Sequence, residues 1–215
     1  MALPKTDVRH AKESANMRRK QCEVTDPKQI EWILGQARIG HLATIGSDGY
    51  PYITPVNFVY HFGNIYFHSA TTGEKLDNLK SNPNVCFEVD IPLAYLDSGF
   101  HPDGAICRLH QFYHCVIIRG RAFLVEDDDT KAQCLNALVS KHEGRVDHEP
   151  VNPESQGFSR CVVVGVEPTS ITAKTDLFQY KSTDIRNKLA KYLAARNAAG
   201  DPQTLESLIM MQQKP

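Results

Sequence analysis

Residues 39–69 contain three β-like runs separated by two tight-turn signals, and this pattern constrains the fold more than any other feature of the chain. The first run begins at Ile39, the second is YPYITPVNFVYH and the third is IYFHS. The turn signals between them are Ser47-Asp48-Gly49 and Gly63-Asn64. Asp-Gly and Gly-Asn supply the positive φ angles that tight hairpin turns require. The segment is therefore predicted to form an antiparallel meander.

The rest of the chain continues the β pattern, with short helices at the joints. Asp26-Pro27 is typical of a helix N-terminus, and the apolar spacing that follows predicts a helix over 27–37. Further predicted elements are a helix over 72–80, a strand over 85–91, a connection over 92–111, a β-rich run over 113–126, a helix over 127–142, a strand over 161–173 and two helical patterns in the tail. About six antiparallel strands with few helices favour a mainly β fold, either a closed or a split barrel.

Composition narrows the possible functions. The 215 residues are 41% hydrophobic, which is ordinary for a soluble globular protein. Lys and Arg total 24 against 25 Asp and Glu, and this balance argues against a nucleic-acid partner. No apolar run reaches the roughly 20 residues that span a bilayer, so no membrane partner is expected. Six scattered cysteines without CxxC pairs, and no recognisable secretory signal, predict reduced thiols in the cytoplasm.

The sequence HSATTGEK (68–75) joins the third β-like run to a predicted helix. A helix N-terminus offers free N–H groups to an anion, and the hydroxyls of Ser69 and Thr72 add donors. Lys75 lies in the first helical turn, where a cation is unfavourable unless an anion lies between it and the helix. Charge-assisted hydrogen bonds contribute about 1.5–3 kcal/mol each, so a few could bind a phosphate. The alternative is a solvated loop rich in Thr and Gly.

Pro55 lies inside the second β-like run and removes one donor from the strand ladder. With Asn57 two positions along, it leaves an irregular strand segment against which a flat ligand could lie. The alternative is an edge strand that proline protects from aggregation, which needs no ligand.

Several segments together resemble the FMN-binding split-barrel family related to pyridoxamine 5'-phosphate oxidase, and in particular its nitroimidazole-resistance (Nim) subgroup. The matching segments are MRRK (17–20), DGYPYITPVNF (48–58), IYFHSATTGEKLDNLKSNPNVCFEVD (65–90), YHCVIIRGRAFLVED (113–127) and KHEGR (141–145). The resemblance covers 17–175, leaving a mobile leader at 1–16 and a C-terminal helical extension at 176–215. It implies a six-stranded antiparallel split barrel.

The resemblance also implies a homodimer with FMN at the subunit interface and a small-molecule substrate. The flavin is expected along Tyr52 to Asn57, on an apolar shelf of Ile53, Pro55 and Val56. His68, Ser69, Thr72 and Lys75 are expected to contact the cofactor, with Lys75 on its phosphate, and Cys115 to face the flavin of the partner subunit. Glu74 occupies a position where the oxidase branch has arginine, so one phosphate partner is missing. The pyridoxal-phosphate-binding residues of the true oxidase are not matched, so vitamin B6 oxidation is not expected.

His68 matches a histidine that the Nim subgroup uses in its active site. An imidazole titrates near neutrality and could donate a proton to a substrate that receives hydride from reduced flavin. The alternative is a cofactor ligand without proton transfer. The predicted function is two-electron reduction of a small aromatic or nitro compound. Two alternatives are a flavin-binding electron carrier or sensor, and a haem protein whose iron is bound by His68, His110 or His114.

Other clusters carry weaker signals. Cys107, His110, His114 and Cys115 lie within nine residues, but they lack the paired cysteines of structural zinc sites, so no metal is expected there. The run Arg18-Arg19-Lys20 could touch an anionic ligand, although a solvated basic turn is the simpler interpretation. The apolar stripes of the tail helices are typical of packing on the barrel or on a second subunit.

Overall fold

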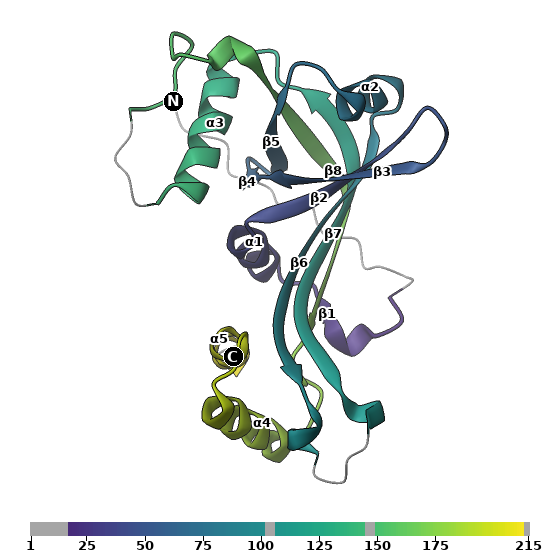
Figure 1. Ribbon diagram of the computed structural model, residues 1–215, viewed down its shortest axis with the longest axis vertical. Helices are drawn as coiled ribbons and strands as arrows, with labels where there is room; N and C mark the ends of the chain where they lie inside the picture. Colours follow the sequence, from purple (N-terminus) through teal and green to yellow (C-terminus); the bar gives the residue numbers. More distant parts are fainter. Residues whose placement is uncertain (1–16, 102–105, 145–148, 213–215) are drawn as a thin grey trace. The chain divides into compact units, whose positions relative to one another are not determined.

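The computed structural model describes residues 17–101, 106–144 and 149–212 (Figure 1). The predicted leader, 1–16, lies outside the described residues. The strands are β1 (Glu23–Val24), β2 (Ile39–Ile45), β3 (Pro51–Asn57), β4 (Val59–His61), β5 (Asn64–Ala70), β6 (Asn84–Leu96), β7 (His110–Leu124) and β8 (Cys161–Asp176). The α-helices are α1 (Pro27–Gln36), α2 (Glu74–Ser81), α3 (Asp128–His142), α4 (Thr183–Arg196) and α5 (Asp201–Gln212).

One sheet contains all these strands, in the order β3-β2-β6-β7-β8-β5-β4, with β1 paired to β8. The pairs of known register are antiparallel, which confirms the mainly β split-barrel fold. The described residues form eight strands rather than the six predicted. The two-residue β1 was not predicted, and the run YPYITPVNFVYH divides into β3 and β4 at the buried Phe58.

The chain forms two compact units, and β6, β7 and β8 contribute to both. The barrel unit contains 25–89 and 116–172, and the helical unit contains 14–24, 90–115 and 173–215, each without its undescribed residues. Whether the domain boundary falls at 176, as the resemblance implies, stays a prediction.

In the barrel unit, the hairpin turns have the backbone that the sequence predicts. Gly49 and Gly63 have φ angles of 84° and 76°, which residues with a Cβ rarely adopt. β2 and β3 pair from Ile39 opposite Asn57 to Ile45 opposite Pro51. Gly40 is required for a different reason, because a Cβ there would lie 2.1 Å from the ring of Phe87.

The helices of the barrel unit begin close to their predicted positions. The Asp26 carboxylate accepts a hydrogen bond from the Lys28 amide at the start of α1. Asp127 caps α3 in the same way, through the amide of Thr130. The first cap was predicted from Asp26-Pro27, whereas Asp127 was expected to be the first residue of its helix and instead caps it. Helix α2 begins at Glu74, two residues later than predicted.

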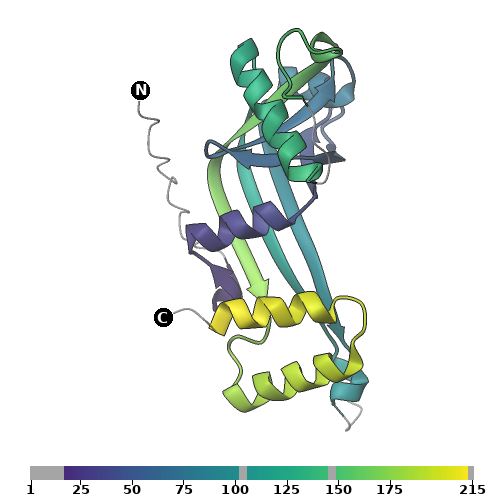
Figure 2. The same ribbon diagram turned by 90° about the vertical axis from the view of Figure 1, so that its left-hand side faces the viewer.

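The helical unit has its own apolar core. Its buried residues come from β6, β7, the segment after β8 and the two C-terminal helices: Leu93, Ala94, Leu96, Phe100, Phe112, Leu177, Phe178, Leu189, Leu193 and Leu208. Helices α4 and α5 lie side by side (Figure 2). Gly200 separates them with a φ of 85° and lies against the Leu93 backbone. Much of the predicted 92–111 connection is therefore ordered, since β6 continues to Leu96 and packs into this core.

Candidate anion and cofactor site

The predicted anion site lies where β5 ends at Ala70 and α2 begins at Glu74. Side chains alternate along β5, so Phe67 and Ser69 are buried whereas His68 is exposed. Ser69 and His68 therefore lie on opposite faces of the strand. The structure does not gather the predicted contacts of this segment on one face.

Lys75 lies on the same side of β5 as Ser69. Its ammonium is 5.2 Å from the centre of the Phe67 ring, and Phe67 shares a strand face with Ser69. Burial lowers the pKa of the half-buried Lys75. Among the described residues, no carboxylate contributes to this shift. The turn therefore contains a partly desolvated cation without an internal counter-charge, which suits an anionic ligand.

The N-terminus of α2 has no side-chain cap. Gly73, at the N-cap position, has a φ of 129°, and Thr72 is exposed and does not cap the helix. The amides of Leu76 and Asp77 bond to the Gly73 carbonyl, which leaves the first amides of the helix to other acceptors. Asp77 pairs with Lys80 at 3.3 Å, which is a weak, exposed contact. Uncapped amides next to Lys75 form a local arrangement that fits a phosphate.

The predicted flavin shelf divides between the two faces of β3, which is at the end of the strand order. Ile53 is 62% exposed and Pro55 is also exposed, but Val56 is 8% exposed. Val56 does not join the apolar shelf, because successive strand residues point in opposite directions and its side chain packs in the core. Its backbone remains on β3 between Pro55 and the exposed Asn57, and Tyr52 is half-buried.

A buried polar chain connects α2 to β3, and the sequence analysis missed it. The Asn78 amide on α2 donates to Thr44 Oγ1 on β2 at 3.1 Å, and this hydroxyl donates to the Tyr52 carbonyl at 3.4 Å. Thr44 and Asn78 are 0% and 5% exposed. The available signal was the inward position of Thr44 on β2, where Gly40 and Leu42 also point to the core. These two hydrogen bonds fix the position of α2 relative to β3.

Two of the three histidines considered as haem ligands lie in the helical unit. His114 is 2% exposed, and its two ring nitrogens bond to Thr175 and Ser207 at 2.8 and 3.1 Å. Burial lowers the pKa of His114 to about 4. Its ring therefore offers iron no nitrogen without breaking these bonds. His110 Nε2 lies 3.4 Å from the buried Asp176 carboxylate.

Two other predicted features belong to the helical unit. Arg19 lies 2.7 Å from Asp176 and donates a hydrogen bond to Tyr180, so it is paired internally and is not simply solvated. Cys115 is half-buried on β7 in this unit, and its predicted role toward a partner's flavin stays a prediction. Within the cluster from Cys107 to Cys115, Cys107 is exposed, whereas His114 is buried and both its ring nitrogens are bonded.

An antiparallel sheet curled into a split barrel, with five α-helices among the described residues, defines the fold class of this chain. Comparison with protein-family models gives a match over 26–175 to pyridoxamine 5'-phosphate oxidase. Because the match spans more than half of the sequence, the chain belongs to the pyridoxamine 5'-phosphate oxidase family. No curated protein matches the sequence significantly.

Solved structures share the fold at low sequence identity. A provisionally assigned 5-nitroimidazole antibiotic resistance protein from Bacteroides thetaiotaomicron has a TM-score of 0.59 and 22% identity, over 71% of this chain and 85% of its own. The flavocytochrome Anf3 from Azotobacter vinelandii has a TM-score of 0.61 and 20% sequence identity, over 74% of this chain and 72% of its own. A FAD and heme binding protein from Mycobacterium smegmatis has a TM-score of 0.60 and 13% sequence identity, over 77% of this chain and 78% of its own. These likenesses establish the fold alone.

In the described part of the chain, every helix is too short or too polar to cross a membrane.

Proposed function

We propose that this protein is an FMN-dependent oxidoreductase that reduces a small aromatic or nitro compound by two electrons. The observation that carries the proposal is Lys75, a half-buried cation to which no carboxylate of the described residues is paired, beside the uncapped N-terminus of α2. The family, and the names of neighbours that bind flavin or confer nitroimidazole resistance, support the same conclusion.

In the barrel unit, one group of residues would bind the cofactor phosphate and another would contact its ring system. Lys75, the Ser69 hydroxyl and the first amides of α2 would bind the phosphate. The exposed Ile53 and Pro55 on β3 would contact the ring system, while the chain from Asn78 through Thr44 holds β3 in place. The bound flavin would supply the two-electron chemistry. His68, which is exposed on β5, would hold the proton that the reduced substrate requires.

The proposal includes a homodimer, supported by an apolar stripe on β2 and β3. Ile39, Ile45 and Ile53 are 50%, 40% and 62% exposed, and β-strand register places Ala43 opposite Ile53. An exposed apolar sheet face of this kind is typical of a protein interface, and a second copy would cover it. All six cysteines are free thiols, which supports the proposed cytoplasmic location.

The test begins with the visible spectrum of the isolated protein and mass spectrometry of the released chromophore. FMN bands followed by nitroimidazole-dependent oxidation of a reduced nicotinamide are the expected results. A flavin spectrum without turnover, with any reductant, would instead favour an electron carrier or sensor. A Soret band without flavin would contradict the proposal.

Light scattering should give the mass of a dimer, and Ile53→Glu should lower the measured mass to that of a monomer.

A further inference from the structure

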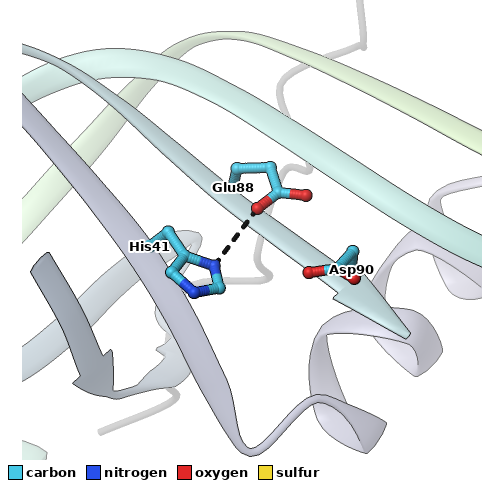
Figure 3. A group of neighbouring side chains, drawn as sticks. All are labelled: His41, Glu88 and Asp90. Carbon is cyan, nitrogen blue, oxygen red and sulfur yellow. Dashed lines mark ion pairs between the residues drawn. The ribbon is translucent and has the colours of Figure 1, made fainter. Parts of the chain in front are cut away.

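His41 and Glu88 form a cross-strand pair in the barrel unit, separate from the anion-suited turn. They lie directly opposite each other on β2 and β6, and His41 Nδ1 is 3.3 Å from Glu88 Oε2 (Figure 3). Asp90 follows Glu88 by two residues on β6, so the backbone of the strand places both carboxylates on one face. The ligand atoms of the three residues all lie within 4.8 Å of one another.

We propose that His41, Glu88 and Asp90 bind one divalent first-row transition-metal ion. Two ligands about 2.0–2.1 Å from a tetrahedral ion are about 3.3–3.4 Å apart, which matches the separation of the imidazole and the Glu88 carboxylate. Some ligand atoms of the three residues are farther apart than this, at up to 4.8 Å from one another. One carboxylate must therefore turn toward the ion when it binds. Asp90 is exposed and can make this rotation without disturbing the core.

The type of ligand selects the class of ion. Imidazole suits zinc, copper, iron and nickel, whereas magnesium and calcium prefer sets made of oxygen alone. Two carboxylates on one strand face repel each other, and a bound cation would relieve that repulsion. Three protein ligands leave one position of a tetrahedral ion open to water or to a substrate.

In the single chain, the surroundings of the group allow an ion to enter. The side chains of His41 and Glu88 are 43% and 31% exposed, so neither must leave a packed core. An ordinary surface ion pair is the competing interpretation, since exposed pairs of this kind contribute little energy and need no ion. Sequence spacing did not indicate the group, because 41 and 88 meet only through strand register. His41 lies directly opposite Pro55, which the proposed function places against the ring system, but metal binding by this group does not require bound flavin.

The test is a cobalt titration of the full-length protein after its metals have been removed with a chelator. Visible ligand-field bands should saturate at one Co²⁺ per chain, without the near-ultraviolet charge-transfer band of a cysteine ligand. His41→Ala and Asp90→Asn should each weaken Co²⁺ binding by about tenfold or more. The matched control is Asp77→Asn, which removes an exposed carboxylate that pairs with Lys80 on the same helix, and it should leave Co²⁺ binding unchanged.

Three results would overturn the proposal. One is Co²⁺ binding that does not saturate at one ion per chain, and a second is a thiolate charge-transfer band. The third is a His41→Ala or Asp90→Asn variant that is folded by circular dichroism and binds Co²⁺ as tightly as the unaltered protein. Zinc should displace the bound Co²⁺, whereas magnesium in excess should not.

Discussion

One cation in each unit, Arg196 and Lys75, shows a contrast in how a charge is compensated. In the helical unit, Arg196 lies 2.6 Å from both Asp97 and Asp201, and Tyr192 also donates to Asp97. In the barrel unit, Lys75 is half-buried, and burial lowers its pKa without a compensating carboxylate. A charge paired within the chain stabilises the chain itself. A desolvated charge that the chain leaves uncompensated is a place where a ligand can contribute.

Breaking the Arg196 pairs should give the largest loss of stability. Asp201 is fully buried, and without the guanidinium its carboxylate has lost its counter-charge. We expect Arg196→Ala to lower the free energy of unfolding by about 3 kcal/mol, the lower end of the range for a broken buried pair. Urea denaturation followed by circular dichroism measures this loss.

Lys191→Ala is the control for this variant, because Lys191 is exposed on the same helix. It should change stability by less than about 0.5 kcal/mol. If both variants changed the free energy of unfolding equally, the ion pairs of Arg196 would not be what stabilises the helical unit.

His114 should make the stability of the protein depend on pH. Burial lowers the pKa of His114 from 6.5 to about 4, so between these values the unfolded chain binds a proton that the folded chain does not. Stability should therefore be complete above pH 6.5 and fall as the pH drops toward 4, by about 3 kcal/mol in total. The measurement is urea denaturation over this pH range for the unaltered protein and for His114→Gln.

The glutamine variant cannot titrate, but its amide can still bond to Thr175 and Ser207. Its stability should change less with pH than that of the unaltered protein, since all other groups are common to both. Identical pH dependence would mean that His114 is not the buried neutral group described here.

Thr44→Val should give the smallest of these effects. The substitution leaves the Asn78 amide buried without its acceptor. It should lower the free energy of unfolding by about 1–2 kcal/mol, the lower part of the range for an unpaired buried polar group. Thr44→Ser keeps the hydroxyl and should restore most of the loss. A valine variant as stable as the serine variant would show that the polar chain from α2 to β3 is unimportant.

The fold was predictable where local chemistry decides it. Asp26 caps a helix because its carboxylate is a good acceptor for free amides, and Gly49 and Gly63 mark turns because other residues avoid positive φ. The length of β6 was not predictable. Its extension from Pro92 to Leu96 depends on packing with residues from distant segments.

The candidate site was predictable only as a set of residue types. Ser69 and Lys75 could be recognised as anion ligands, but the face on which each side chain lies depends on strand register. Val56 is buried whereas Ile53 is exposed, because their side chains point to opposite faces of β3. The pairing of His41 with Glu88 also requires register, which a single sequence does not specify.

The most direct test of the account is an FMN titration of the unaltered protein, Lys75→Ala, Lys80→Ala and Arg18→Ala, followed by flavin fluorescence. Lys80 is an exposed cation on the same helix, and Arg18 is an exposed cation in the helical unit. Loss of one charge-assisted contact of about 1.5–3 kcal/mol predicts about 10- to 100-fold weaker FMN binding for Lys75→Ala, with both controls unchanged. Equal affinity in all four proteins would contradict the claim that the strand–helix turn binds the cofactor phosphate.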